Sequence, residues 1–288
     1  MLDQFAPLAL LAALVVLAAC SSPEEMEQAL HVDAKDHAHG SDHVQASCGA
    51  TAISGKGAAR EVKVANEQYV FEYSYPQAAG SLAGLRAYLD NDLGTSQTEI
   101  AALAKEAMGD ASEYDYPYRP YSLIVGWQVV TDLPGWISLS RANWTYTGGA
   151  HGNSDTAGLV WDKTAAAPFS PIELFTSAGK LEAALTQDYC TALGKLRAER
   201  RPERRPEHRP EHRPDAVDAG FADCPKLEAL TLLVGSSDKQ TFNRIGLIAD
   251  PYVAGSFAEG PYEVTLPVNN AILAAVKPEY RGAFSIPR

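Results

Sequence analysis

Residues 69–75 read Tyr-Val-Phe-Glu-Tyr-Ser-Tyr, and this stretch decides the fold class of the chain. An aromatic side chain occupies every second position, and Glu72 and Ser74 lie between them. A period of two residues is typical of a β-strand that has one face in a hydrophobic core. The stretch therefore predicts a half-buried strand, and a shorter strand is expected just before it at Glu61–Ala65.

Two helices are predicted after this strand. The first has an apolar face formed by Leu82, Leu85 and Leu89. The second begins at residues 96–99, Ser-Gln-Thr-Glu, which fit a capping box because the hydroxyl and the carboxylate each accept a backbone N–H there. It is expected to end at Gly109. The side chains expected to be buried in it are Ile100, Leu103 and Ala107.

Strands are expected in the rest of the first half. Tyr121–Val130 and Trp136–Thr147 predict a hairpin, because residues 134–135, Pro-Gly, supply a turn in which proline presets φ and glycine permits a positive φ. Another strand is expected at Leu159–Asp162. The proline-containing stretch 168–171 follows it and separates two halves of the chain.

The second half is predicted to mix helices and strands in the same way. Its expected elements are Ile172–Phe175, a helix near Gly179–Leu196, strands at Leu230–Val234, Arg244–Ile248 and Tyr262–Val268, and a short helix at Asn270–Val276. The strands look hairpin-linked, and the sequence has no glycine-rich βαβ fingerprint. We therefore predict an α+β fold with antiparallel sheets and packed helices, in two sequential subdomains, 58–165 and 166–288.

The N-terminal segment predicts that the protein is exported across the cytoplasmic membrane. An apolar run ends in Leu-Ala-Ala-Cys at residues 17–20, a pattern that closely resembles the lipobox cut by lipoprotein signal peptidase. The run is too short for a transmembrane helix, which needs about 20 residues. Residues 1–19 are thus expected to be a signal peptide and Cys20 to carry the lipid that anchors the protein in a bilayer. Ser21 favours the outer membrane facing the periplasm, by analogy with lipoprotein sorting.

Residues 20–57 are polar and poor in large apolar side chains, so we predict a disordered tether between the lipid and the folded part. Its histidines and aspartates leave two possibilities open. They form either a simple polar linker or a weak site for a transition metal, since imidazole and carboxylate groups bind such ions. The candidate ligands are His31, His37, His39 and His43.

The formal net charge of the chain is −12. Such a charge repels nucleic acid, which we exclude as a partner, and attracts cationic partners. Since disulfides persist in an oxidising periplasm, we predict a Cys190–Cys224 bond. Cys48 then has no partner within this pair and is either a free thiol or an intermolecular partner. Cys190 and Cys224 bracket an Arg-Pro-Glu repeat at 199–214, where a proline at every fourth position forbids a regular helix.

His151 is the candidate for chemistry in the folded part. It follows Gly148-Gly149-Ala150, and these glycines let the backbone turn tightly and present the imidazole beside a sheet edge. Two roles stay open at this point. The histidine either pins the loop by hydrogen bonds or acts in acid–base catalysis with a carboxylate, for which Asp155 and Glu263 are candidates.

The motif at 146–153, Tyr-Thr-Gly-Gly-Ala-His-Gly-Asn, belongs to a wider resemblance. It is followed by Pro-Ile-Glu-Leu-Phe at 171–175, by Pro251-Tyr252, and by Glu-Gly-Pro-Tyr-Glu-Val at 259–264. This order resembles the paired domains of unknown function in the extracellular part of RsiV-type anti-sigma factors. The first of these domains also precedes the catalytic domain of PdaC-type peptidoglycan deacetylases. The resemblance covers roughly residues 60–285, with a PdaC-like first and an RsiV-like second domain.

The resemblance implies cell-wall surroundings and the binding of a protein or a glycan. The RsiV-type ectodomain binds lysozyme. Two features of the family were not found in this sequence: a sigma-binding segment and a deacetylase metal motif. We therefore expect a non-enzymatic envelope lipoprotein without a cofactor, whose ligand is a cationic lysozyme-type enzyme or peptidoglycan. The alternative is a cell-wall hydrolase that uses His151. The candidate binding residues are those of the motifs: Gly149, His151, Asn153, Tyr252, Tyr262 and Glu263.

Overall fold

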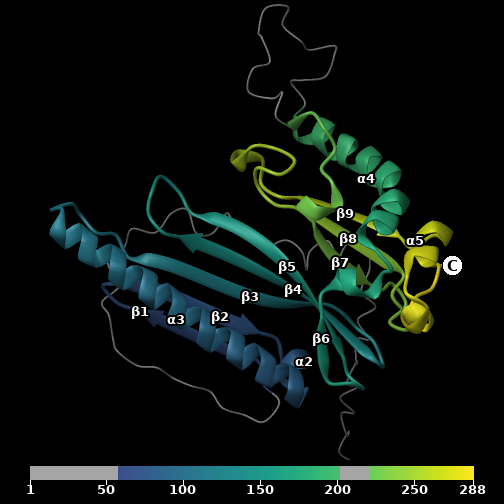
Figure 1. The fold of residues 1–288 in the computed structure, drawn as a ribbon, viewed down its shortest axis with the longest axis horizontal. Helices are drawn as coiled ribbons and strands as arrows, with labels where there is room; N and C mark the ends of the chain where they lie inside the picture. Colours follow the sequence, from purple (N-terminus) through teal and green to yellow (C-terminus); the bar gives the residue numbers. More distant parts are fainter. Residues whose placement is uncertain (1–57, 202–220) are drawn as a thin grey trace, which may run out of the picture.

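The computed structural model describes residues 58–201 and 221–288, which form two β-sheets with helices packed on them (Figure 1). The larger sheet has six strands in the order β1-β2-β3-β4-β5-β6. Their bounds are Arg60–Ala65, Tyr69–Tyr75, Tyr121–Asp132, Trp136–Tyr146, Asn153–Asp162 and Ala167–Phe169. The predicted signal peptide, the tether with its histidines and Cys48, and residues 202–214 of the repeat lie outside the described residues.

The predicted α+β class is confirmed, and the pairing of one strand pair differs from the expectation. All neighbours in the larger sheet are antiparallel except β2 and β3, which are parallel, so this sheet is mixed. The helices α2 (Gln77–Gly80) and α3 (Ala83–Glu113) connect β2 to β3. A connection that crosses the sheet returns the chain in the original direction, which gives a parallel pair instead of a hairpin.

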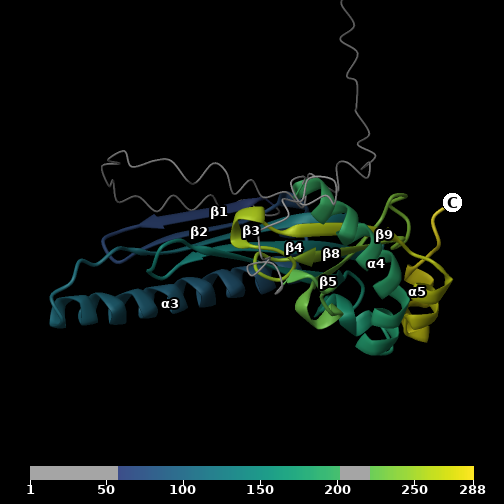
Figure 2. The ribbon, with the colours of Figure 1, turned by 90° about the horizontal axis from the view of Figure 1, so that it is seen from above.

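Helix α3 is one element of 31 residues, so the prediction of two separate helices was wrong. Ser96 and Gly109, the expected start and end, both lie inside it. A buried stripe with a spacing of mostly three or four residues runs through the expected break and packs on the sheet (Figure 2). This continuous packing overrides the local capping signal. The stripe contains Leu85, Leu89, Leu93, Ser96, Ile100 and Ala104, whereas Leu103, expected inside, is 50% exposed.

The core under α3 is aromatic, as the alternation at 69–75 predicts. Phe71, Tyr73 and Tyr75 are buried beneath the helix. The indole N–H of Trp127 donates to the Tyr73 hydroxyl oxygen at 2.8 Å, and that hydroxyl contacts the Asp92 carboxylate at 2.7 Å. Burial, with a contribution from the Asp92 carboxylate, raises the pKa of Tyr73 far above its ordinary value. The Tyr73 hydroxyl therefore stays protonated, and its hydrogen bond joins β2 to α3.

The second sheet is antiparallel and has the order β7-β8-β9. Its strands are Thr231–Gly235, Arg244–Ala249 and Tyr262–Pro267, and the helices beside it are α4 (Ala178–Arg200) and α5 (Asn270–Ala275). The larger sheet continues past the expected boundary at residue 165, because β6 pairs with β5. Short 3-10 helices occur at Pro171–Leu174, Leu227–Ala229, Phe257–Glu259 and Pro278–Ala283.

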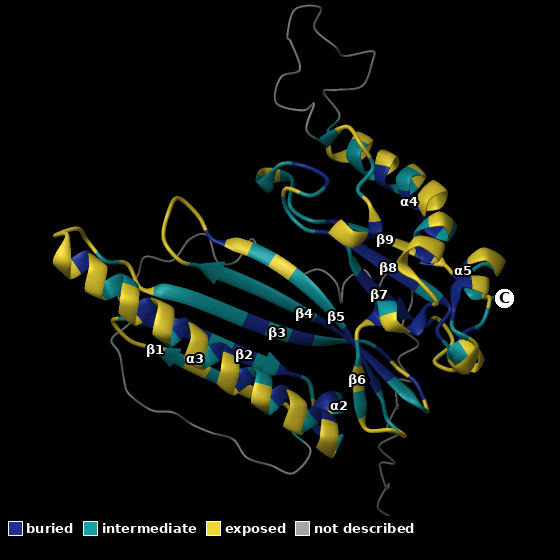
Figure 3. Cartoon of the chain, in the orientation of Figure 1, coloured by how far each residue is buried: buried dark blue, intermediate teal, exposed yellow. Residues whose placement is uncertain are grey.

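The two sheets pack directly against each other, and the region where they meet is largely buried (Figure 3). Leu233 of β7 and Ile248 of β8 contact Val130 of β3. The sheets approach most closely at Gly158, where a Cβ atom would lie 2.4 Å from the main-chain oxygen of Leu232. This face of the larger sheet is the one opposite α3, and the second subdomain covers part of it.

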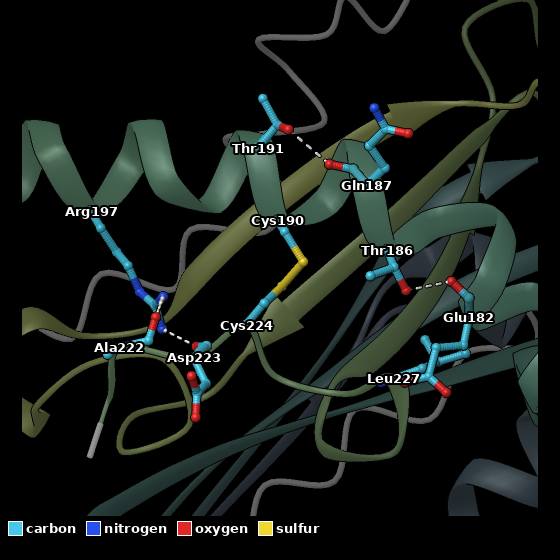
Figure 4. Close-up of a disulfide and its surroundings, with 10 residues drawn as sticks. All are labelled: Glu182, Thr186, Gln187, Cys190, Thr191, Arg197, Ala222, Asp223, Cys224 and Leu227. Carbon is cyan, nitrogen blue, oxygen red and sulfur yellow. Dashed lines mark hydrogen bonds between the residues drawn. A yellow bond between two sulfur atoms is a disulfide. The ribbon is translucent and has the colours of Figure 1, made fainter. Parts of the chain in front are cut away.

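A disulfide joins Cys190 of α4 to Cys224, the pair that the sequence analysis selects (Figure 4). The Arg197 guanidinium lies nearby and donates to the main-chain oxygens of Ala222 at 3.4 Å and Asp223 at 3.1 Å. These contacts hold the chain that returns after the repeat against α4. Among the described helices, none combines the length and the apolar character that a membrane span needs.

Candidate ligand-binding site

Two loops that are far apart in the sequence meet where His151 contacts Tyr252 and Phe257. One is the β4–β5 turn at residues 147–152, and the other is the β8–β9 loop at residues 250–261. Gly148 and Gly149 have φ values of +96° and +89°, a region that favours glycine because it lacks a Cβ atom. The turn therefore needs both glycines to present His151 toward the second loop.

His151 is held by rings and hydrogen bonds of the turn and the second loop. Its ring stacks on Phe257 with 4.1 Å between centroids and 23° between planes. Its Nε2 lies 3.4 Å from the Tyr252 hydroxyl, and its Nδ1 lies 2.8 Å from the Gly152 main-chain oxygen. Neither Asp155 nor Glu263 contacts the ring. The contacts that His151 makes are those expected of a histidine that pins the loop.

Two further aromatic side chains line the same end of β4. The rings of Trp144 and Tyr146 are nearly parallel, with 15° between planes and 6.4 Å between centroids. The Tyr146 hydroxyl donates to the main-chain oxygen of Gly149 at 3.3 Å. Gly152 is buried against the Trp144 indole, where a Cβ atom would come within 2.5 Å of ring atoms. We name these five rings the aromatic cluster: Trp144, Tyr146, His151, Tyr252 and Phe257.

The cluster has an exposed side. Tyr252 is 53% exposed, and its φ of +71° is unusual for a residue other than glycine. Strain of this kind costs about 1–3 kcal/mol and persists only where surrounding contacts hold it. Register places Trp144 and Tyr146 beside Ile124 and Ser122 of β3, on the sheet face opposite α3. Within the described part of the chain, the rings of the cluster are partly or largely exposed beside that face.

Glu259 holds the second loop in shape. Its carboxylate accepts from Ser256 Oγ at 2.9 Å and from the Ser256 main-chain N–H at 3.1 Å. It also accepts from the Arg201 guanidinium and from the Tyr262 hydroxyl. Burial by itself raises the pKa of this carboxyl, but the hydrogen bonds from Arg201, Tyr262 and Ser256 outweigh it and lower the pKa to about 2.

This pKa predicts a pH-dependent stability. The folded-state pKa of Glu259 lies below the ordinary value of 4.5, so its contribution is present above pH 4.5 and is lost as the pH falls toward about 2. Urea unfolding of the wild type and of Glu259→Gln should give a large difference at pH 6 that shrinks on acidification. Glu99→Gln, an exposed α3 position, is the matched control. A difference that stays constant down to pH 2.5 would contradict the assignment.

A second contact joins the β8–β9 loop to the larger sheet. The Thr156 hydroxyl donates to Asp250 Oδ1 at 2.7 Å, and the Thr156 main-chain N–H donates to Oδ2 at 3.1 Å. Thr156 Oγ1 also lies 3.2 Å from Thr231 Oγ1. Burial raises the pKa of Asp250 despite the hydrogen bonds from Thr156, which lower it. This carboxylate positions the start of the loop that carries Tyr252.

The structure brings only some of the predicted binding residues together. His151 and Tyr252 contact each other, and Gly149 lies in the same turn. Tyr262 is fully buried, with the Arg200 guanidinium 4.3 Å above its ring, so it supports the loop and is not part of the exposed surface. Glu263 lies in a separate groove beside α4. Asn153 is exposed at the start of β5.

Three members of the cluster were not among the predicted binding residues: Trp144, Tyr146 and Phe257. Trp144 precedes Tyr146 by two residues, and this same-face spacing was a usable signal. Phe257 had no such signal, because only folding brings it to His151. The predicted metal-binding histidines of the tether are not described. Within the described residues, no group of three or more His, Cys, Asp and Glu side chains is placed to hold a metal ion.

Comparison with known proteins gives one family match. Residues 62–154 match the family model of the deacetylase PdaC. No curated protein matches the chain. Two solved structures are similar, both with 15% sequence identity: a DUF3298 family protein of Pseudomonas aeruginosa PAO1 and a DUF3298 family member of Bacteroides fragilis NCTC 9343. The first has a TM-score of 0.49 and the second 0.42.

Both alignments cover 80% of this chain, and they cover 97% and 98% of the respective structures. The family match spans β2, α3, β3 and β4, and it ends just after the turn that presents His151. The predicted resemblance to a PdaC-like domain is therefore confirmed over residues 62–154.

Proposed function

We propose that this chain is a non-catalytic envelope lipoprotein that binds the glycan strands of peptidoglycan through the aromatic cluster. The observation that carries the proposal is the cluster itself, with its exposed Tyr252 and the nearly parallel rings of Trp144 and Tyr146. Pyranose rings present apolar C–H faces that pack on aromatic rings, while their hydroxyls bond to nearby polar groups. The hydroxyls of Tyr146 and Tyr252 and the imidazole of His151 are such groups.

The cluster suits binding better than hydrolysis. Hydrolysis of a glycosidic bond needs two carboxyl groups, or their equivalents, on either side of the bond. Two candidate carboxylates have other partners, because Asp155 accepts from the Asn143 side chain at 2.8 Å and Asp250 accepts twice from Thr156. Among the described residues, no carboxylate is hydrogen-bonded to the His151 ring.

Lysozyme is the competing ligand from the sequence analysis. The net charge of −12 favours encounter with a cationic enzyme, and such steering weakens with salt. A ring surface packs on sugars by contacts that salt affects little. The proposal therefore expects binding to purified cell-wall sacculi that persists at moderate salt.

The decisive variants are Trp144→Ala and Tyr252→Ala. Each is expected to weaken co-sedimentation with purified sacculi by about tenfold or more, because an aromatic contact worth about 1.4 kcal/mol is lost. Tyr114→Ala is the matched control, since Tyr114 is 70% exposed at the far end of α3. Thermal unfolding and near-UV circular dichroism should show that Tyr252→Ala keeps the fold.

Three results would overturn the glycan assignment. The first is sacculus binding that both cluster variants retain in full. The second is no sacculus binding by the wild type together with salt-sensitive capture on immobilised lysozyme, which would favour the enzyme as the ligand. The third is release of muropeptides by the wild type that the His151→Ala variant loses while it keeps its melting temperature, which would establish a hydrolase.

The lipid anchor is tested separately at Cys20. Cys20→Ala is expected to abolish membrane association and to leave the unprocessed precursor, because the thioether to the lipid cannot form. A palmitate analogue supplied to growing cells should label the wild type and not the variant. A wild type that takes up no label and fractionates as a soluble protein would show the lipobox interpretation to be wrong.

A further inference from the structure

Helix α4 lies beside strand β9 of the second sheet (Figure 1), and a groove between them is lined by residues of both elements. Its volume is about 570 Å³, which lies within the roughly 300–1,000 Å³ of ligand-binding grooves. Ala192, Leu196 and the buried Val264 give it an apolar floor. The other lining residues are Gln187, Asp188, Thr191, Lys195, Glu199, Glu263 and Thr265.

One wall of the groove is a strand edge with main-chain groups that point outward. Among the described strands, β9 is the last of the second sheet, and it pairs with β8 alone. The Val268 N–H donates to the Asn243 main-chain oxygen at 3.0 Å. This bond shows which residues of β9 direct their main-chain groups toward β8 and which direct them away from it. In an antiparallel pair of strands, the main-chain N–H and C=O of every second residue point away from the partner strand. By this alternation the N–H and C=O of Thr265 point toward the groove.

Residues on either side of Thr265 limit the part of the β9 edge that can pair with an added strand. Pro267, the next outward position, has no N–H to donate. At the other end, the Pro261 main-chain oxygen already accepts from the Arg200 guanidinium at 2.6 Å. Thr265 is exposed between these two limits. Edge strands that natural proteins leave open over a few residues are sites at which an extended peptide adds as a further strand.

The other wall of the groove is formed by α4, and its charged side chains determine which charge a bound partner should carry. Asp188, Lys195 and Glu199 lie on one face of α4, at helical spacings. Among the described lining residues on α4, Asp188 and Glu199 carry carboxylates and Lys195 carries an ammonium group, so the net charge of this wall is negative. A strand added beside β9 would present every second side chain to this wall. Basic side chains at those positions complement it.

We propose that the groove binds an extended, basic peptide segment of a partner protein by strand addition to β9. Main-chain hydrogen bonds at Thr265 supply the register, and the carboxylates of α4 select basic side chains at alternate positions. This site is independent of the proposed glycan binding. It uses neither the aromatic cluster nor the β4–β5 turn.

The test uses the purified full chain and a fluorescein-labelled heptapeptide, Lys-Val-Lys-Val-Lys-Val-Lys. Fluorescence anisotropy should show binding that the sequence Glu-Val-Glu-Val-Glu-Val-Glu lacks. Thr265→Pro should raise the Kd at least about tenfold, because it removes the outward N–H and leaves the bonds to β8 intact. Thr265→Val, which keeps the N–H, should change the Kd less than about twofold.

Three further measurements separate strand addition from simple charge attraction. The same basic peptide with methylated main-chain nitrogens at alternate residues should bind at least about tenfold more weakly. Glu199→Gln should weaken binding most at low salt. The Thr265 amide should become protected from hydrogen exchange when the unmethylated peptide is added.

Several outcomes would overturn the proposal. They are no binding of the basic peptide, equal binding by Thr265→Pro and the wild type, or equal binding of the methylated peptide. A dimer that dissociates on Thr265→Pro substitution would assign the edge to a second copy of the chain instead. Near-UV circular dichroism of Thr265→Pro guards against an effect of unfolding, and the methylated peptide tests the wild type directly.

Discussion

Removal of the Cys190–Cys224 disulfide by the double substitution Cys190→Ala/Cys224→Ala is expected to lower the free energy of unfolding by up to about 4 kcal/mol. The two residues are 34 apart in the sequence, and a cross-link across a loop of that length restricts the unfolded chain strongly. Both cysteines are partly buried against the core that α4 shares with the second sheet. The substitutions therefore also remove some packing.

Chemical denaturation with and without dithiothreitol measures this effect. The reductant should lower the midpoint of the wild type toward that of the double variant, and it should leave the variant unchanged. Non-reducing peptide mapping should show Cys190 linked to Cys224. A link from Cys48 to either residue, or a wild type that does not respond to reduction, would contradict the pairing.

The second large effect is expected at Gly158, where Gly158→Ala should cost about 2–3 kcal/mol of stability. The new Cβ atom would lie 2.4 Å from the main-chain oxygen of Leu232 and 3.0 Å from Leu233 Cδ2. A main-chain atom in a paired strand cannot move aside alone. The two sheets would therefore have to move apart locally.

Gly126→Ala is the matched control for this prediction. Gly126 lies on the same face of the same sheet, but the nearest atom to its added Cβ is Ser74 Oγ at 3.9 Å. Alanine is expected to be neutral or slightly stabilising there, because it restricts the unfolded chain. Urea unfolding of the two variants measures the contrast. Equal stabilities would mean that close packing at Gly158 does not hold the sheets together.

Local patterns in the sequence were enough for most single elements. The alternation at 69–75 predicts β2 with its observed bounds, and Pro134-Gly135 marks the turn between β3 and β4. The apolar stripe from residue 181 to 196 predicts α4. These signals are reliable because the periods of a strand and a helix are properties of the chain itself.

The errors arose where a distant partner decides the local conformation. A capping signal at Ser96 is normally sufficient to start a helix, yet Ser96 is buried inside α3. The larger sheet offers a long surface, and a single helix with a continuous stripe buries more of it than two shorter helices. The parallel pairing of β2 and β3 has the same origin, since it follows from the path of that helix.

The sequence by itself determined the fold class, the order of most elements and the cysteine pair, because these depend on local periodicity, turn chemistry and the count of cysteines. Tertiary structure alone decided what the surface offers. It placed His151 beside Tyr252, 101 residues away, and it excluded Tyr262 from the surface by burying its ring beneath Arg200. The physical reason is that hydrogen-bonding and stacking partners across sheets are chosen by packing, which no local pattern encodes.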